Sequence, residues 1–343
     1  MNLIRKKYIL LMVLIAVGDG VLSADQNSLD AYTQTSLCKM QNNNDCCQQS
    51  SYCEDAFGRF FIRGDLLYWK PHVSGIELDF GTAYIDQVTT DGTQVTRTEE
   101  FDADPHFKWN CGYRVAAGYQ FVRSNWEIDA YWTSFQGTSS RDSTEDVDTI
   151  NTGKYKVRLN QLDVDLAYNL PLCPSFILKP FVGVRGARIH QSLNAQLTTD
   201  ITFSPTSLAT ETRILDDSQK FCGIGPILGL EGGWNLGCGF GVYGSAIGGV
   251  LYGIDKVHFN DTDIFTAPIS KQIFSLNNRN IHEFNCTLDL AIGLSWQTCV
   301  YDGFQLTLKL DFEHHEYFNQ NKFSATRGDL CFDGGVFSIS IDM

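Results

Sequence analysis

Long apolar runs are missing from this sequence: no uncharged stretch approaches the roughly 20 residues that a membrane-spanning helix needs. The nearest candidate, residues 239–254, contains six glycines and is a poor helix former. Basic residues are also scarce, because 26 Lys and Arg stand against 40 Asp and Glu, for a net charge of −14. Such an acidic chain lacks the positive surface that nucleic-acid binding requires. Charged residues make up only 19% and aromatic residues 13%, which argues against disorder.

The N-terminus has the features of a secretory signal peptide. A basic segment at residues 5–7 precedes an apolar stretch at 8–17, and the small residues Ser23 and Ala24 follow. About ten apolar residues are too few to cross a bilayer. We therefore predict that residues 1–24 are cleaved; a retained membrane anchor is the alternative.

Cysteine is abundant, with eleven in the chain, which suggests an oxidising compartment for an exported protein. The odd total leaves at least one thiol free or paired with another chain. Four cysteines lie close together near the mature N-terminus, without the C-x2-C pairs of zinc modules. We predict that these four form disulfides within or between chains and that residues 25–56 form a flexible periplasmic arm, with zinc binding as the alternative. The four are Cys38, Cys46, Cys47 and Cys53.

The dominant pattern is a period-2 alternation of apolar with polar or small residues, which is typical of β-strands with two differently solvated faces. It is clearest in residues 109–121, 282–297 and 304–313. These segments are longer than the five or six residues of average globular strands, and they reach the roughly 9–11 residues of a membrane strand. We predict an all-β fold, a transmembrane antiparallel up-and-down β-barrel over residues 57–343 with the apolar face toward lipid. A soluble sandwich with that face inward is the alternative.

We predict eleven strands and, because bacterial barrels usually have even counts, a twelfth within 193–216; about 12 are expected, within a range of 10–16. The eleven span 58–70, 74–83, 107–122, 124–136, 154–170, 175–190, 220–235, 237–253, 280–297, 302–317 and 330–343. Short connections suit periplasmic turns and long polar ones suit extracellular loops. The short connections are 169–174, 235–238 and 298–303, and the long ones are 84–106, 137–153, 191–219 and 254–279.

Two local features refine the barrel prediction. The apolar phase slips within residues 154–170, and a β-bulge near Asn160 or Gln161 would absorb the slip. Aromatic residues near strand ends are expected to form girdles at the two membrane interfaces. They are Trp69, Tyr119, Trp126, Trp132, Trp234 and Trp296.

No pattern points to catalysis, a metal or a cofactor. Residues 239–244 fit G-x-G-x-x-G, but a strand-like segment follows where a dinucleotide site needs a helix. His314 and His315 are adjacent, so on a strand they face opposite sides, and zinc proteases instead space two histidines four residues apart on a helix. No Ser-His-Asp arrangement can be placed. We predict no enzymatic activity and no cofactor, with an outer-membrane hydrolase as the alternative.

The charged residues of the lumen-facing set are the candidates for pore lining, because fixed charges in a water-filled lumen bias which ions and solutes pass. The alternative is a filled interior in which opposite charges pair, since narrow barrels fill with side chains. The candidates are Arg59, Arg63, Asp65, Arg114, Glu127, Asp129, Lys154, Lys156, Arg158, Asp163, Asp165, Lys179, Arg185, Asp289, Lys309, Asp311 and Glu313.

Three segments resemble the Legionella-type major outer membrane protein family, which is also found in chlamydia-related bacteria. Residues 60–70 (FFIRGDLLYWK) resemble its first strand, 179–188 (KPFVGVRGAR) its mid-barrel strand, and 312–321 (FEHHEYFNQN) its penultimate-strand signature. The resemblance implies a pore-forming outer-membrane barrel. The cysteine content is similar to that of the chlamydial major outer membrane protein, whose family forms disulfide-linked envelope networks. The chain departs from most barrel proteins in ending with Met343 in place of an aromatic residue.

Together these observations predict a porin of the bacterial outer membrane that lets small solutes or ions diffuse, with a structural role through disulfide cross-linking. The expected partners are outer-membrane lipid, small hydrophilic solutes or ions, further copies of the chain and disulfide-linked envelope proteins, and no nucleic acid. The alternative function is a closed-lumen structural or adhesive barrel without channel activity.

Overall fold

A computed structural model describes residues 58–74, 85–88, 94–97, 107–121, 124–146, 149–204, 207–266, 271–301, 304–322 and 328–343. The predicted signal peptide, the arm with its four clustered cysteines and, apart from Ser74, the predicted strand at 74–83 lie outside the described residues. Within those residues, no helix has the length and apolar character needed to cross a membrane.

The described residues form thirteen β-strands. They are β1 (Arg59–Val73), β2 (Ile85–Val88), β3 (Gln94–Arg97), β4 (Asn110–Gln120), β5 (Trp126–Asp146), β6 (Thr149–Tyr168), β7 (Leu170–Cys173), β8 (Phe176–Ser204), β9 (Ser207–Gly237), β10 (Phe240–Thr266), β11 (Lys271–Tyr301), β12 (Phe304–Asn321) and β13 (Gly328–Asp342).

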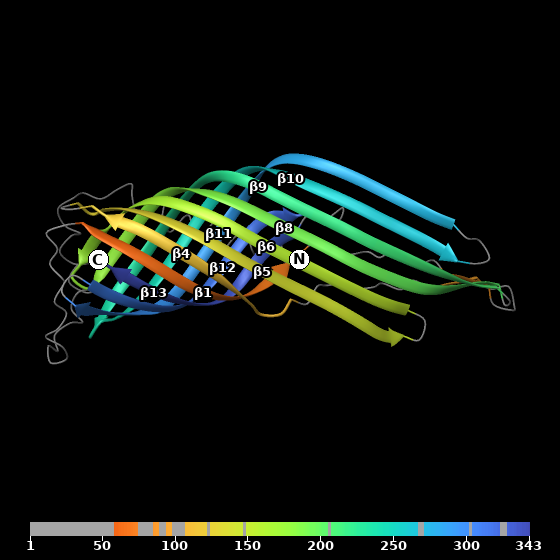
Figure 1. Ribbon diagram of the computed structural model, residues 1–343, viewed down its shortest axis with the longest axis horizontal. Helices are drawn as coiled ribbons and strands as arrows, with labels where there is room; N and C mark the ends of the chain where they lie inside the picture. Colours follow the sequence, from red (N-terminus) through yellow and green to blue (C-terminus); the bar gives the residue numbers. More distant parts are fainter. Residues whose placement is uncertain are drawn as a thin grey trace.

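Ten of these strands close into an antiparallel barrel (Figure 1). The order is β6-β5-β4-β1-β13-β12-β11-β10-β9-β8, and the pairing of β6 with β8 closes the ring. The short β7 pairs with β8 outside the ring, and β2 with β3 forms a separate hairpin. The predicted barrel is confirmed, but the predicted twelfth strand is wrong. Residues 193–216 are instead the ends of β8 and β9, paired from Leu193↔Asp217 to Ser204↔Ser207.

The apolar faces of the strands point outward, as predicted. The exposed fraction is 70% for Phe284, 65% for Ile292 and 61% for Leu310. Leaving these side chains in water would be costly, whereas hydrocarbon accepts them, so this surface is the lipid-facing band. Trp132 also points outward, but Trp69 is only 1% exposed and lies inside the barrel, so its assignment to an interfacial girdle is wrong.

The barrel has two unlike ends. At one end the connections are short, and Gly237, Cys238 and Gly239 make the β9–β10 turn with φ angles of 99°, 55° and 81°. The C-terminal strand also ends there, beside Phe61 of β1 (Figure 1). Short turns mark the periplasmic end of such barrels, so we call this end periplasmic and the other extracellular.

At the extracellular end, β5, β6, β8, β9, β10 and β11 continue beyond the other four barrel strands as a tall sheet, which we call the wall (Figure 1). The predicted loops at 137–153, 191–219 and 254–279 are wrong, because most of their residues belong to these long strands; 84–106 includes β2 and β3. The strands continue because their sequences keep alternating beyond the lipid-facing band. In this upper part the apolar side chains point into the barrel and the polar ones point outward, the reverse of the arrangement in the membrane. That is the arrangement water requires once the sheet leaves the membrane.

The predicted β-bulge in β6 is also wrong. The strand pairs with β5 without a register shift from Ser140↔Lys154 to Trp126↔Tyr168. Its inward positions change from apolar Leu159 to polar Asp163, and its outward positions change from Arg158 to Leu162. The slip in the apolar phase therefore marks the level at which the outer surface passes from water to hydrocarbon.

Candidate functional site

The barrel interior brings together fourteen of the seventeen predicted pore-lining residues. They are Arg59, Arg63, Asp65, Arg114, Glu127, Asp129, Asp163, Asp165, Lys179, Arg185, Asp289, Lys309, Asp311 and Glu313. The other three, Lys154, Lys156 and Arg158, lie on the outer face of β6, in phase with the exposed Leu162. The assumed bulge had placed them on the wrong side.

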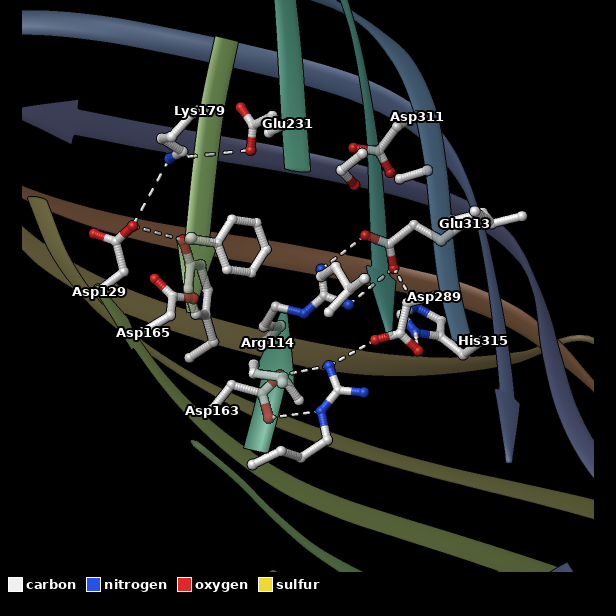
Figure 2. Close-up of a pocket in the computed structure, with 18 of the residues that line it drawn as sticks. Arg114, Asp129, Asp163, Asp165, Lys179, Glu231, Asp289, Asp311, Glu313 and His315 are labelled. Carbon is white, nitrogen blue, oxygen red and sulfur yellow. Dashed lines mark hydrogen bonds and ion pairs between the residues drawn. The ribbon is translucent and has the colours of Figure 1, made fainter. Parts of the chain in front are cut away.

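Nearest the periplasmic end, Lys179 of β8 lies among three carboxylates. Its Nζ is 3.3 Å from Glu127 Oε1. It also lies 3.8 Å from Asp129 Oδ2 and 4.0 Å from Glu231 Oε2 (Figure 2). Lys309 of β12 approaches Glu231 at 3.9 Å. Cations and anions from β5, β8, β9 and β12 are thus paired across the interior, not arranged as a ring of one sign.

A second group lies deeper in the barrel. Both terminal nitrogens of Arg114 donate to the Glu313 carboxylate at 2.8 Å, a bidentate pair. Arg114 Nη1 also lies 3.3 Å from Asp65 Oδ2, and Arg63 Nε lies 3.0 Å from Asp65 Oδ1. Every one of these side chains comes from β1, β4 or β12.

A third group joins the second through a histidine (Figure 2). Arg185 Nε and Nη2 donate to Asp163 at 2.9 Å each, and Nη2 lies 2.6 Å from Asp289 Oδ2. His315 lies between Asp289, at 3.0 Å, and Glu313, at 2.8 Å. A continuous chain of charged groups, from Asp163 on β6 to Arg63 on β1, therefore crosses the bore. We call it the charged chain.

Two charged members of these three groups were missed at the sequence level. His315 was dismissed with its neighbour His314, although its parity matches the inward Glu313. Glu231 lies in the glycine-rich end of β9, where small residues obscure the alternation. Following the alternate, inward-facing positions of each strand to the end of the strand would have identified both residues.

An apolar layer lies on the extracellular side of the charged chain, and we call it the plug. The Trp69 ring lies 4.6 Å from the His315 ring of the charged chain, tilted by 47° to it, and packs at 5.4 Å against Phe135 and 5.9 Å against Phe332. Plug residues come from β1, β5, β6, β8, β9, β10, β12 and β13, and all are almost fully buried. They include Leu67, Trp69, Phe135, Val157, Leu159, Ile189, Phe221, Leu251, Tyr317, Leu330 and Phe332.

Beyond the plug, a lysine from the end of β12 reaches into the interior. Lys322 Nζ lies 2.9 Å from Asp255 and contacts Glu283, and its backbone N–H donates to Gln219 at 3.0 Å. The side chains of Asp255 and Gln219 are fully buried. The bore is therefore filled here by polar side chains that bond to one another.

The open volume is distributed unevenly along the bore. A vestibule of about 600 Å³ opens at the periplasmic end, between residues such as Arg59, Lys179 and Lys309. Within the charged chain, only about 110 Å³ remains, which is room for a few waters. In the part of the chain that the structure describes, no group of three or more His, Cys, Asp and Glu side chains is arranged to hold a metal ion.

A closed antiparallel barrel with an apolar outer band and ionised groups inside defines an outer-membrane β-barrel protein. The family described as Legionella pneumophila major outer membrane protein precursor matches residues 56–337. The chain belongs to this family and is a protein of the bacterial outer membrane, as the resemblance in three segments predicted.

Solved structures that match include the outer membrane protease OmpT from Escherichia coli, 10% identical over 84% of this chain and 96% of that chain, with a TM-score of 0.39. The Ralstonia pickettii toluene transporter TbuX is 7% identical over 84% and 90%, with a TM-score of 0.28. Ail, the attachment invasion locus protein of Yersinia pestis, is 9% identical over 84% and 99%, with a TM-score of 0.21. No curated protein sequence matches the chain.

Proposed function

We propose that this protein is a closed-lumen structural barrel that holds the wall above the outer membrane, and not an open general-diffusion porin. The observation that carries the proposal is the succession of charged chain and plug across the bore. Trp69 and Phe332 are 1% and 0% exposed, although both point into the bore, where an open pore would expose them to water. Our proposal therefore follows the alternative function predicted from the sequence, in place of the porin.

The physical reason lies in the cost of passage. A solute leaving the vestibule meets paired ions at Arg114 and Arg185, and parting such buried pairs costs several kcal/mol, about 3–5 for each. It then meets an apolar layer from which water is excluded, and ions do not cross a dewetted constriction. Ten strands also enclose a narrow interior that side chains can fill.

Planar-bilayer recording of the refolded protein tests the proposal, with a general-diffusion porin reconstituted under the same conditions as the positive control. We expect no stepwise conductance from this protein while the porin gives regular steps. Uniform steps that scale with the amount of folded protein would overturn the closed-lumen proposal.

Ion conduction remains the second candidate, and the vestibule is the observation that favours it. The charged residues of its lining are Arg59, Lys179 and Lys309 with the single carboxylate of Glu231, so a conducting state with this excess of cations would be expected to select anions at this mouth. In that case Lys309→Glu would shift the reversal potential of the steps toward cations. Lys108→Glu would not, because Lys108 is exposed before the start of β4 and does not line the vestibule. An unchanged potential in both variants would show that any current bypasses the vestibule.

We also propose that the structural role includes disulfide cross-linking to other copies of the chain or to envelope proteins. The support is the number of cysteines in an exported protein, eleven in all. No disulfide joins two of the described cysteines, so the barrel strands are not stapled to one another. We assign the cross-links to the clustered cysteines at 38–53, because four cysteines within 16 residues were predicted from the sequence to form disulfides within or between chains.

A further inference from the structure

The outer surface of the wall strands changes from apolar to basic over one or two outward positions. On β8 the outward series runs from Val184 through Gly186 to Arg188, and on β9 it runs from Ile224 to Lys220. The same change occurs on β6 and β10. Each change lies on the extracellular side of the lipid-facing band, where the headgroups of the outer leaflet lie.

Four of the basic residues form one row across neighbouring strands, which we call the basic row. Arg158 of β6 pairs in register with His190 of β8, His190 with Lys220 of β9, and Lys220 with Lys256 of β10. Strands lie about 4.8 Å apart, so the row is about 14 Å long. Lys220 and Lys256 are thus directly opposite one another, and like charges in that arrangement destabilise a sheet. An anion bound between them would offset this repulsion.

These cations differ from those inside the barrel in having no carboxylate partner. Among the described residues, no ion pair is formed by Arg158, Lys220, Lys256 or the nearby Arg188, and all four are exposed. In a chain with a net charge of −14, such a row is a local exception.

Next to the row, the outer surface holds an apolar groove of about 640 Å³. Its lining includes Trp132, Leu162, Ile224 and Tyr252, and Arg188 lies at its edge. Gly186 contributes no side chain to the groove, and a Cβ added there would meet only the Leu162 carbonyl oxygen, at 3.9 Å. Gly186 therefore leaves space in the groove, and a side chain added at this position would begin to fill it.

We propose that the groove and the basic row together bind an anionic lipid of the outer leaflet, with an acyl chain in the groove and phosphate groups at the row. The apolar groove adjoins cations without carboxylate partners at the level of the lipid headgroups. The groove suits an acyl chain and the cations suit phosphate groups, so the combination suits a phosphorylated lipid. The opposite side of the barrel offers no equivalent among the described residues, because outward Asp333 there already pairs with His314 and lies 3.6 Å from His72. The lipid is thus held on one side of the barrel.

Lipid A carrying two phosphates is the probe, and fully dephosphorylated lipid A is its comparison; binding to the refolded full chain in detergent is measured by native mass spectrometry. The test variant is Lys220→Gln with Lys256→Gln. The matched control is Lys70→Gln with Lys108→Gln, on β1 and beside β4, across the barrel from β9 and β10. Each lysine near an anionic headgroup contributes about 1 kcal/mol, or about fivefold in affinity. We expect about 25-fold weaker binding from the test pair and less than about twofold from the control pair.

A second pair of variants tests the groove. Gly186→Leu would fill it, whereas Gly248→Leu adds the same side chain to the lipid face of β10, where a Cβ meets nothing within 4 Å. We expect only Gly186→Leu to weaken binding, and excess inorganic phosphate to leave the lipid bound. Folding of every variant is checked by the faster migration of unboiled protein on gels.

Three results would overturn the proposal: equal binding of phosphorylated and dephosphorylated lipid A, equal losses in the two double-lysine variants, or displacement of the lipid by inorganic phosphate. The surface lies outside the bore, so the outcome is independent of whether the protein conducts.

Discussion

Replacing Arg185 with Met would test whether the interior is sealed from water. Arg185 is 1% exposed and holds two carboxylates, Asp163 at 2.9 Å and Asp289 at 2.6 Å. Removing one partner of a buried ion pair typically costs about 3–5 kcal/mol, because the remaining charge is left without compensation. Asp289 keeps His315 at 3.0 Å and Asp163 keeps the Gln161 amide at 2.7 Å, so we expect a loss within that range and not above it.

The assay is unfolding in urea of protein refolded into lipid vesicles, followed by tryptophan fluorescence. With a denaturant slope of about 2–3 kcal/mol per molar, the midpoint should fall by about 1–2.5 M for Arg185→Met. Arg188→Met is the matched control, because it lies three residues away on the outer face of the same strand and is exposed. An exposed substitution of this kind should change stability by no more than about 0.5 kcal/mol.

A triple variant separates lost attraction from uncompensated charge. Adding Asp163→Asn and Asp289→Asn to Arg185→Met removes the two orphaned carboxylates, so most of the lost stability should return. If Arg185→Met costs no more than Arg188→Met, the carboxylates are hydrated without their partner. The bore would then be wet, and the closed-lumen proposal would lose its main support.

Two further predictions concern the outer surface and the N-terminal cysteines. Leu228→Arg places a charge on the lipid face, where Leu228 is 65% exposed, and should cost about 2–4 kcal/mol in vesicle unfolding, against about 0.5 or less for Ser140→Arg on the water-exposed face of the wall; equal costs would contradict the placement of the lipid-facing band. Serine at all four of Cys38, Cys46, Cys47 and Cys53 should abolish high-mass bands on non-reducing gels of cell envelopes, and their persistence would show that other cysteines carry the cross-links.

Much of the barrel could be predicted from the sequence because alternation is a local property. Ten of the eleven predicted strands coincide with barrel strands, and outward residues such as Phe284 and Leu310 were assigned to the correct face. Strand length was not predicted, because polar stretches such as 191–219 were assigned to loops. A polar outward face is expected of any strand in water, so polarity alone does not distinguish a loop from a strand that has left the membrane.

The interior could be predicted only in part. Parity places Arg114 and Glu313 inside, but it does not say that they pair, because β4 and β12 lie far apart in the chain and meet only across the bore. Trp69 shows the opposite difficulty. A tryptophan near a strand end is typical of an interfacial girdle, and only its odd number, shared with the inward Asp65, separates it from that group.

That same parity bears on whether the lumen is open. In a water-filled pore the inward set should stay polar from one end of a strand to the other. In β6 it does not: Val157 and Leu159 occupy the same face as Asp163 and Asp165, and all four are buried. A bulge would have moved the apolar pair outward and kept the lumen polar, but the register is continuous. The alternation in the sequence of β6 therefore slips because the inward residues of the plug are apolar. A family member whose inward residues were polar along the whole of this strand would be expected to conduct.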